Sequence, residues 1–498
     1  MKTEHFPSDI QPFITPKPGG DLGYDCLNCQ ARFKPDRLYY TCPKCGGLLM
    51  LTDSQFPRLK EQPGSFWRRL FDHRLMANDP AIRGVFTFHE FIAPLIPLED
   101  VIYLGEGHTP VVAAPEVLAK EVGAEFYVKL DGLNPSASFK DRGMAAALSY
   151  LKYLTRIQGL TQVIAVCAST GDTSAAAALY SASLGGPVKS AVLLPQGRVT
   201  PQQLSQPLGA GATVFELPGV FDDCMRVVEY LSEQYQVTLL NSKNPWRVLG
   251  QESYAYEVAQ QFDYEVENLV LIVPVGNAGN ITAILNGLLK FYKAGIIESL
   301  PKIIAVQSER ANPVFLYYRE EPQARKYVPV TVKPSVAQAA MIGDPVSFPR
   351  LAALVAQYEK ATHKPSFFAV EVTEKAIMEG TLAANRRGLP VCTQGGEGLA
   401  GLKAALALGL IGPKEKAVID STAHALKFMD FQNAYFNGGL AAEYGIETRA
   451  ELVNKPKTLD IPGPLPDGRT KLSLTDQKLF VKTAAQKIAQ SLGLKATA

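Results

Sequence analysis

The spacing of apolar residues separates a long central region of the chain from its two ends. Between about 101 and 449, short runs rich in valine and isoleucine alternate with amphipathic stretches of helical spacing. Continuous apolar strands separated by helices are typical of parallel sheets buried on both faces. The clearest runs are VIAVCA at 163–168, SAVLLP at 190–195, LVLIVPV at 269–275, KIIAVQ at 302–307 and KAVID at 416–420. The pattern predicts an α/β fold with mostly parallel sheets.

The two ends of the chain lack this alternation. Residues 1–60 are rich in loop-forming residues and contain four cysteines, and residues 61–100 are helical in part, through SFWRRLFDHRLM. After residue 450, a linker rich in proline and glycine, NKPKTLDIPGPLPDG, precedes an amphipathic helix, TDQKLFVKTAAQKIAQSLG. We expect this helix to pack on the body of the protein or on a partner subunit. The predicted regions are therefore 1–60, 61–100, 101–449 and 450–498.

Composition and charge mainly exclude classes of function. The 498 residues are 47% hydrophobic and 20% charged, and the formal net charge is +2. That charge is too small a bias to favour nucleic acid or an anionic membrane as a partner. No apolar run reaches the roughly 18 residues of a membrane span, and the N-terminal MKTEHFPSDIQPF lacks the apolar core of a secretory signal. We therefore expect a cytoplasmic protein with no nucleic-acid or membrane partner.

Four of the seven cysteines form two C-x-x-C pairs that are twelve residues apart, with two glycines after the second pair. This spacing is typical of a four-thiolate zinc site, whereas the odd total and the clustering argue against a disulfide framework. A small loop-rich segment also needs a cross-link in order to fold. The predicted ligands of a structural Zn²⁺ are Cys26, Cys29, Cys42 and Cys45. A redox or iron role is less favoured, and we expect the remaining cysteines to be buried as small hydrophobic residues. These are Cys167, Cys224 and Cys392.

Candidate chemistry lies where strands end, because ligands of open parallel sheets bind beyond the carboxyl ends of the strands. The loop GNAGN at 276–280 follows one apolar run and precedes the helical pattern of ITAILNGLLKFYKAG. A strand, a glycine-rich loop and a helix start together favour an anion cradle made of backbone N–H groups. The alternative is a tight turn in which the glycines supply positive φ.

Two further junctions are rich in hydroxyl groups. After the run at 163–168, STGDTS supplies four hydroxyls within six residues, which is more than helix capping requires, so we expect a polar binding surface. The four are Ser169, Thr170, Thr173 and Ser174. The neighbouring Asp172 can accept a hydrogen bond from a ligand hydroxyl. After the run at 416–420, Ser421 and Thr422 offer hydroxyls that suit a neutral heteroaromatic nitrogen, and His424 is expected to be structural.

The fourth junction is NPSASFKDRG at 134–143, between the strand and turn of EFYVKLDGL and the helix of MAAALSYLKYL. Ser138 is expected to cap this helix, with Asp141 completing a capping box. Lys140 then lies at the positive end of the helix dipole, which lowers its pKa and favours a neutral amine that forms Schiff bases with carbonyls. The alternative is a solvated lysine paired with Asp141.

Together, a Schiff-base lysine, a phosphate cradle, a polar partner and a hydroxyl for a ring nitrogen describe a site for pyridoxal phosphate. From about residue 20 to 450 the chain also resembles the fold-type-II pyridoxal-phosphate enzymes, and among them the threonine synthases. The motifs that carry the resemblance are GEGHTP, DGLNPSASFKDRGM, CASTGDTSAA, PQGRVTPQQLSQPLGAGATV, FDDCM, NSKNPWRVLGQES, GNAGN, NPVFLYY, IGDPVSFPR and STAHALKF. Several are similar to the plant-type branch. The cysteine cluster and LNPSASFKDRG differ from that branch, so its regulation by S-adenosylmethionine is not transferred.

The resemblance implies two open, mostly parallel-sheet domains within 101–449, the smaller at about 140–260, beside a small zinc-ribbon-like segment at the N-terminus. It implies that Lys140 forms the internal aldimine and that Phe139 packs against the cofactor. It also implies that Asp172 contacts the ring hydroxyl and that Thr422 faces the ring nitrogen. The residues implied for the cofactor phosphate are Gly276, Asn277, Ala278, Gly279 and Asn280.

The implied reaction is β,γ-replacement on O-phospho-L-homoserine. Lys140 moves protons, the γ-phosphate leaves, and water adds at Cβ to give L-threonine and phosphate. The candidate donors for the substrate phosphate are Asn134, Ser136, Ser138 and Arg142. For Arg142 the alternative is an ion pair with Asp141 or another neighbour.

Other activities remain open on the same site. They are cysteate synthase, which acts on phosphoserine and sulfite, threonine dehydratase, and another lyase of phosphorylated or hydroxy amino acids. An interpretation from a different class is a zinc-knuckle binding protein on an inactive enzyme scaffold, which the retention of Lys140 and the glycine loop disfavours. We also consider a homodimer.

Overall fold

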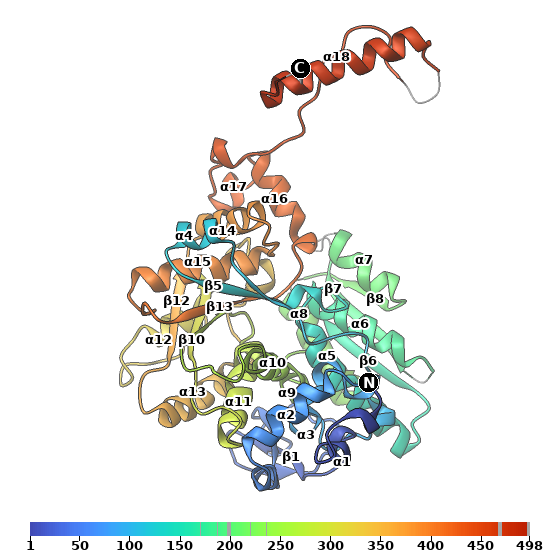
Figure 1. Ribbon diagram of the computed structural model, residues 1–498. Helices are drawn as coiled ribbons and strands as arrows, with labels where there is room; N and C mark the ends of the chain where they lie inside the picture. Colours follow the sequence, from blue (N-terminus) through green and yellow to red (C-terminus); the bar gives the residue numbers. More distant parts are fainter. Residues whose placement is uncertain are drawn as a thin grey trace.

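The computed structural model describes residues 1–169, 171–186, 188–196, 201–219, 221–235, 237–466 and 471–495, apart from the side chains at 201–203, 221–222 and 233. In this part of the chain the strands form sheets of six, four and three strands (Figure 1). The strands are β1 (Leu22–Cys26), β2 (Arg32–Phe33), β3 (Leu49–Asp53), β4 (Val111–Ala113), β5 (Phe126–Leu130), β6 (Val163–Ala168), β7 (Val188–Pro195), β8 (Thr213–Leu217), β9 (Val237–Leu239), β10 (Leu269–Pro274), β11 (Lys302–Ser308), β12 (Phe367–Val372) and β13 (Lys416–Ser421). The α-helices are α1 (Gln11–Ile14), α2 (Gly64–Arg74), α3 (His89–Ile92), α4 (Glu116–Val122), α5 (Lys140–Gln158), α6 (Asp172–Leu184), α7 (Pro201–Gly209), α8 (Phe221–Gln234), α9 (Pro245–Gln251), α10 (Ser253–Gln261), α11 (Gly279–Lys293), α12 (Pro313–Tyr318), α13 (Phe348–Thr362), α14 (Glu374–Arg386), α15 (Thr393–Ala407), α16 (Met429–Phe436), α17 (Ala441–Tyr444) and α18 (Leu474–Leu492).

The six-stranded sheet has the order β12-β11-β10-β13-β5-β4, and its neighbours are parallel except for β4 with β5. Every residue of β10 is buried, as expected for a continuous apolar run in a sheet covered on both faces. The predicted runs at 269–275, 302–307 and 416–420 correspond to β10, β11 and β13. Because β10, β13 and β5 are adjacent and parallel, the loops that follow them lie side by side at one edge of the sheet.

The four-stranded sheet, β8-β7-β6-β9, is parallel throughout and lies between residues 163 and 239. Its strands β6 and β7 match the predicted runs at 163–168 and 190–195. Helix α6 packs on this sheet and carries four consecutive buried alanines, whose small side chains allow helix and sheet to approach closely. The two parallel sheets confirm the predicted α/β fold.

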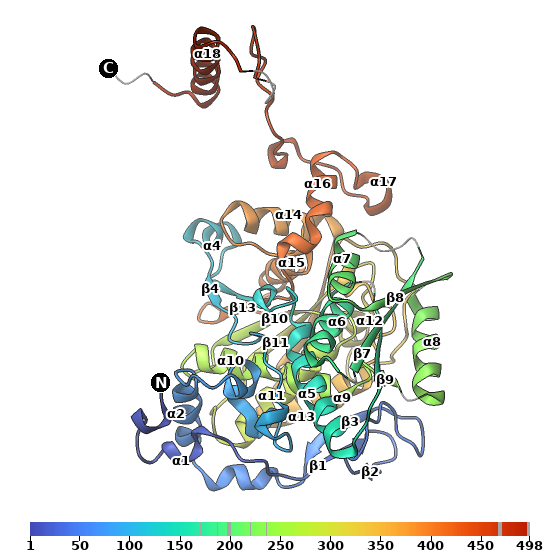
Figure 2. The same ribbon diagram turned by 90° about the vertical axis from the view of Figure 1, so that its right-hand side faces the viewer.

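The N-terminal segment forms a small antiparallel sheet, β2-β1-β3, in which Cys26 pairs with Leu49. It shares an apolar core with the body of the protein, and that core includes Tyr24 of β1 and Trp246 of α9. Helix α2 occupies the predicted helical stretch after residue 61. Figure 2 shows the small sheet at the base of the molecule, below α5 and α9. The segment is therefore part of the compact body and not a separate appendage.

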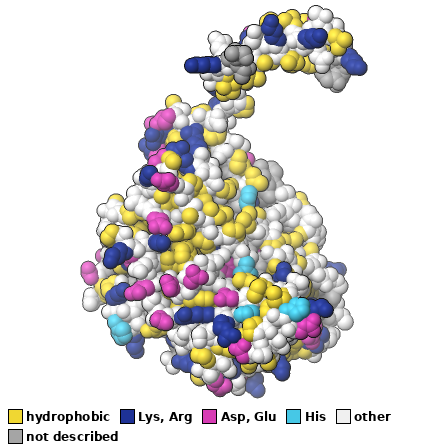
Figure 3. Space-filling model, in the orientation of Figure 1, with side chains coloured by type: hydrophobic (Ala, Val, Ile, Leu, Met, Phe, Trp, Pro, Cys, Tyr) yellow, Lys and Arg dark blue, Asp and Glu magenta, His cyan; other side chains and the backbone are white. Residues whose placement is uncertain are grey.

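Helix α18 stands away from the body in both views (Figures 1 and 2), and it has no buried residue. The expectation that it packs on the body is therefore wrong, and packing on a partner subunit stays a prediction. Apolar and basic side chains share its surface in Figure 3, while acidic and basic residues are interspersed on the face of the body shown there. Within the described residues, no helix is both long enough and apolar enough to cross a membrane.

Candidate active site

Three of the four predicted junctions meet at the edge of the six-stranded sheet. The backbone N–H of Phe139 donates to the carbonyl of Thr422 (2.9 Å), which joins the loops after β5 and β13. The side-chain amide of Asn280 donates to Asp420 (2.7 Å), which joins the start of α11 to the end of β13. Lys140 begins α5 directly after the first of these loops. The lysine, the glycine loop and the hydroxyl loop therefore surround one place.

Lys427 connects the remaining junction, at the end of β6, to this edge. Its ammonium forms an ion pair with Asp172 (2.7 Å) and donates to the carbonyl of Ser136 (3.0 Å). Sequence reasoning missed Lys427, although STAHALKF contains it. Its partners, Asp172 and Ser136, belong to other junctions, so nothing in the local motif marks the lysine. His424 itself caps the following turn, since its Nδ1 accepts from the N–H of Leu426, and this confirms its structural role.

The amine of Lys140 is poised to be neutral near physiological pH. Burial lowers the pKa of Lys140 to about 7; the carboxylate of Asp172 opposes this effect, whereas the cations Arg247 and Lys427 add to it. The nitrogen lies 3.6 Å from the centroid of the Phe139 ring. The lowered pKa of Lys140 agrees with the sequence argument, which attributed it to the helix dipole. Burial is its main cause in the structure. The alternative of a solvated lysine paired with Asp141 is not what the structure contains.

We predict that uptake of pyridoxal phosphate by the cofactor-free protein depends on pH through Lys140. Only the neutral amine attacks an aldehyde, so the uptake rate should rise with pH up to about 7 and level off above it. A lysine with the ordinary pKa of 10.5 would give a rate that keeps rising at about tenfold per pH unit. Stopped-flow absorbance between about pH 6 and pH 9 distinguishes the two profiles. A rate without a plateau would contradict the prediction.

Arg247 of α9 is a buried cation that sequence reasoning also missed. One guanidinium nitrogen donates to the carbonyl of Leu240 (3.0 Å), but Nε has no partner among the described residues. Burial lowers the pKa of Arg247 to about 10, so the group stays charged at neutral pH. A buried charge without a counter-ion is costly, and such a group suits a site that receives an anion. The signal in the sequence was an arginine inside a helix whose residues are otherwise mostly apolar or small.

The geometry of the 276–280 loop favours the anion cradle over the tight turn. Neither Gly276 nor Gly279 has positive φ, while Ala278 does, at 58°. A Cβ on Gly279 would meet nothing closer than 3.8 Å, so neither backbone conformation nor crowding requires glycine there. The absence of a side chain instead leaves room above the first N–H groups of α11, which have no intrahelical partner. The buried Oδ1 of Asn280 is also without a partner among the described residues.

The hydroxyls of the other loops differ in how they are engaged. Thr422 is buried, and its hydroxyl shares a long hydrogen bond (4.0 Å) with the thiol of Cys392, in which either group can be the donor. The role of Thr422 toward a ring nitrogen stays a prediction. Ser169 and Ser174 both bond to the backbone of Gly171, which is local structure rather than a binding surface. Thr170 lies outside the described residues.

Ser138 is not the cap of α5, contrary to the sequence prediction. The residue before the helix is Phe139, without a side-chain cap, and the backbone of Ser138 instead forms a bridge with Ala423. Asp141 accepts hydrogen bonds from the N–H (2.6 Å) and hydroxyl (2.5 Å) of Ser136, so the capping box does not form. The hydroxyl of Ser138 is buried and without a described partner, which leaves it free for a ligand.

Two of the predicted substrate residues are used inside the fold. Arg142 is fully buried and binds Asp131 and Glu257 through both oxygens of each. This is the ion-pair alternative, with partners other than Asp141, because the first turn of α5 faces α10 and the end of β5. Asn134 donates to the carbonyl of Asp131 and accepts from the N–H of Gly107, so it fixes the loop.

The four predicted zinc ligands come together in one cluster. Their sulfur atoms all lie within 4.8 Å of one another, with Cys26 to Cys45 at 3.5 Å and Cys29 to Cys42 at 3.6 Å. Zinc–sulfur bonds of about 2.3 Å in a tetrahedron place sulfurs at about these separations. No disulfide joins them, and Cys167, Cys224 and Cys392 are free and buried as expected. The donor set therefore fits a four-coordinate metal.

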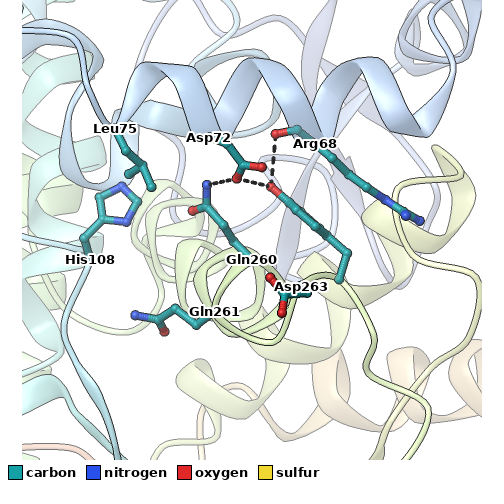
Figure 4. A pocket seen from close by; sticks show the side chains of 8 residues that line it. Arg68, Asp72, Leu75, His108, Gln260, Gln261 and Asp263 are labelled. Carbon is teal, nitrogen blue, oxygen red and sulfur yellow. Dashed lines mark hydrogen bonds between the residues drawn. The ribbon is translucent and has the colours of Figure 1, made fainter. Parts of the chain in front are cut away.

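A surface hollow of about 570 Å³ lies away from these residues, between α2 and the end of α10. Asp72 accepts hydrogen bonds from the amide of Gln260 and from the hydroxyl of Tyr264. Figure 4 shows the guanidinium of Arg68 pointing away from the hollow. His108 of the GEGHTP motif lines its wall, but no predicted site residue does. We therefore do not place the reaction there.

Comparisons with known proteins agree with this geometry. The family model described as pyridoxal-phosphate dependent enzyme matches residues 102–421. The threonine synthase of Methanocaldococcus jannaschii is 36% identical over 407 residues, which cover 81% of this chain and 93% of that protein. Threonine synthase 2, chloroplastic, of Arabidopsis thaliana is 34% identical over 413 residues, which cover 82% of this chain and 77% of that protein. Since the archaeal and plant relatives are similarly close, membership of the plant-type branch is not established.

A solved structure supports the fold. The crystal structure of threonine synthase from Escherichia coli has a TM-score of 0.61 to this chain at 21% identity. The match covers 93% of this chain and 94% of that one, so the likeness extends over most of the fold.

Proposed function

Because this chain belongs to the pyridoxal-phosphate-dependent enzymes and is a homologue of the threonine synthases, we propose that it converts O-phospho-L-homoserine and water to L-threonine and phosphate. The observation that carries the proposal is Arg247, a buried guanidinium whose Nε has no hydrogen-bond partner among the described residues and whose charge acts on Lys140. A cofactor phosphate has its own cradle at 276–280. A second anion receptor near the lysine therefore suits a substrate that brings a phosphate of its own.

The residues around Lys140 suit pyridoxal phosphate, which when bound supplies a conjugated ring that draws electrons from the substrate. Lys140 holds the cofactor through its neutral amine and, once released, accepts and returns protons at Cα, Cβ and Cγ of the substrate. The N–H groups at the start of α11 hold the cofactor phosphate, and Thr422 donates its hydroxyl to the ring nitrogen. Phe139 packs beside the ring, and Asp172, fixed by Lys427, faces the ring hydroxyl.

The substrate phosphate is assigned to Arg247 and to the hydroxyl of Ser138. Both offer buried donors without described partners, and the arginine can bind phosphate through a charge-assisted hydrogen bond. Ser136 is less suited, because its hydroxyl already donates to Asp141.

We assign the four-cysteine cluster to one structural Zn²⁺, because its separations and thiol donors match that metal. With all four positions filled by protein, such an ion has no open site for chemistry. Its role is then to hold β1 and β3 together.

The activity assay uses purified protein, pyridoxal phosphate and O-phospho-L-homoserine, with phosphate and threonine both measured. Equal release of the two products is expected. Phosphoserine with sulfite and unphosphorylated threonine serve as competing substrates and should give little product. The proposal would be overturned if the kcat/KM for forming cysteate from phosphoserine, or 2-oxobutyrate from threonine, exceeded the kcat/KM for forming threonine from O-phospho-L-homoserine.

Replacement of Arg247 with methionine is expected to lower kcat/KM for O-phospho-L-homoserine by roughly a hundredfold, mainly through KM, because a buried anion loses its charged donor. The visible absorbance of the bound cofactor should persist, since Lys140 is retained. The matched variant Arg247→Lys keeps the charge without the guanidinium fork and should recover part of the loss. An unchanged KM in Arg247→Met would remove Arg247 from the substrate site.

A further inference from the structure

The four-cysteine segment and the active site are connected by residues 239–247, which we call the bridge segment. It runs from the end of β9 into the first turns of α9, and Leu240, Asn244 and Trp246 within it are fully buried. Hydrogen bonds hold it from two sides, with the small antiparallel sheet on one side and the loops of the active site on the other. A shift of that sheet is therefore transmitted to residues that bind ligand.

Two tyrosines of the cysteine segment, by which we mean residues 22–53 with the four cysteines and β1 to β3, form hydrogen bonds with the bridge segment. The hydroxyl of Tyr24 accepts a hydrogen bond from the indole N–H of Trp246 (2.7 Å), and both side chains are fully buried. The hydroxyl of Tyr40 accepts from the backbone N–H of Leu239 (2.9 Å). Each tyrosine lies two residues before a cysteine of the cluster, so a metal held by these cysteines would fix the backbone that carries it.

Arg350 supplies a third connection from α13. Its Nε donates to the carbonyl of Leu49 in β3 (2.9 Å), while its other two nitrogens donate to the carbonyls of Ser242 (3.1 Å) and Lys243 (2.9 Å) in the bridge segment. Arg350 is fully buried, and in the described structure these carbonyls and the hydroxyl of Ser347 are its partners. A buried guanidinium held by carbonyls tolerates no displacement of its acceptors, because a lost hydrogen bond there is not replaced by water.

The active-site side of the bridge segment is held as firmly. Asn241 donates to and accepts from the backbone of Ala168, at the end of β6 (2.6 and 3.0 Å). Arg247, the last residue of the bridge segment, is the proposed receptor of the substrate phosphate. The backbone N–H of Ser347 donates to the carbonyl of Asn277 in the phosphate loop (3.1 Å), so the contact of Arg350 with Ser347 reaches the cofactor cradle as well.

We propose that the metal-bound cysteine segment positions both phosphate receptors of the active site, with Tyr24 and Arg350 as the positioning residues. The metal fixes β1 and β3, these strands fix the bridge segment, and the bridge segment fixes Arg247. Loss of the metal or of either contact lets α9 and the 276–280 loop move, which weakens binding of both phosphates. The proposal rests on the assigned role of Arg247, but the effect on the cofactor cradle does not depend on which substrate the enzyme takes.

The test compares Tyr24→Phe and Arg350→Met with the same two substitutions at a buried tyrosine and a buried arginine outside the bridge segment. Tyr358→Phe removes a buried hydroxyl that donates to Pro301. Arg74→Met removes a buried arginine that binds the carbonyls of Phe13, Ile14 and Thr87 and both carboxylate oxygens of Glu90. The affinity of each holoenzyme for inorganic phosphate is measured by calorimetry, and the affinity of the corresponding cofactor-free protein for pyridoxal phosphate by absorbance titration. We expect about a tenfold loss of both affinities in the two bridge variants and less than about twofold in the controls. Equal losses in bridge and control variants would overturn the proposal.

Metal removal is an independent arm that needs no substitution. Holoenzyme with one zinc per chain is treated with a chelator, and both affinities are measured before and after zinc is restored. We expect a reversible loss of about tenfold in each. Affinities that stay within twofold after zinc is removed, or a purified protein that carries no metal, would overturn the role of the metal. A failed threonine assay with an intact effect on pyridoxal phosphate would refute the substrate assignment alone.

Discussion

Replacing Lys140 with alanine is expected to lower activity by at least about 10,000-fold and to abolish the visible absorbance of the bound cofactor. In the proposed mechanism the same amine holds the cofactor and moves the protons, so a neighbouring group would have to supply both tasks to replace it. Lys427 is the nearest other candidate, but its ammonium is committed to Asp172 and to the carbonyl of Ser136. Activity is measured by phosphate release, and cofactor binding by absorbance after dialysis.

The identity of the lysine can be established without relying on activity. Borohydride treatment of the wild-type holoenzyme should fix the cofactor on the peptide that contains Lys140, and mass spectrometry locates it. Lys427→Arg serves as the control variant, because it preserves the ion pair with Asp172 and should keep the cofactor on Lys140. Cofactor mass on any other peptide, or an absorbing Lys140→Ala protein, would refute the assignment.

The fold was predictable for strands whose own residues indicate whether their two faces are buried. The apolar runs that became β6, β10, β11 and β13 are continuous because both faces of each strand are covered, and that pattern is local in the sequence. The convergence of the four cysteines was predictable for a similar reason, since the spacing of the two C-x-x-C pairs is also a local pattern. The position of α18 could not be predicted. An amphipathic pattern predicts an apolar partner, but it does not say whether that partner lies in the same chain.

The residues of the candidate site also fall into those that the sequence could predict and those that it could not. Lys140, the 276–280 loop and Thr422 follow strands that the pattern identifies, so their convergence could be inferred from sheet topology. Arg247 and Lys427 could not, because their importance depends on which charges face them, and those charges come from other junctions. The expectation that Arg142 grips the substrate fails for this reason: its partner Glu257 is 115 residues away, and a local motif cannot reveal it. Ser138 was misassigned as a cap because its backbone pairs with the loop after β13.

Replacing Arg142 with methionine is expected to lower the free energy of unfolding by about 3 to 5 kcal/mol. Its guanidinium donates to both oxygens of Asp131 (2.8 Å each) and to both oxygens of Glu257 (2.5 and 2.8 Å), and all three side chains are fully buried. Methionine fills much of the space but leaves two buried carboxylates with Lys129 as their nearest described cation. Urea unfolding at pH 7 measures the loss of unfolding free energy. Arg142→Lys keeps the positive charge, so its free energy of unfolding should lie between those of the wild type and Arg142→Met.

Acid should narrow the difference between the wild type and Arg142→Met. Burial favours the protonated form of Glu257, but the charges of Arg142 and Lys129 outweigh it and hold its pKa well below the usual value. A carboxyl with a lowered pKa adds stability above its unfolded pKa, near 4.3, and that stability is lost as pH falls from there toward the folded pKa. The wild-type advantage should therefore shrink progressively as pH falls below about 5. The folded variant should keep KM for O-phospho-L-homoserine within about twofold, as expected for a residue outside the substrate site. A raised KM with an unchanged unfolding curve would instead return Arg142 to the substrate.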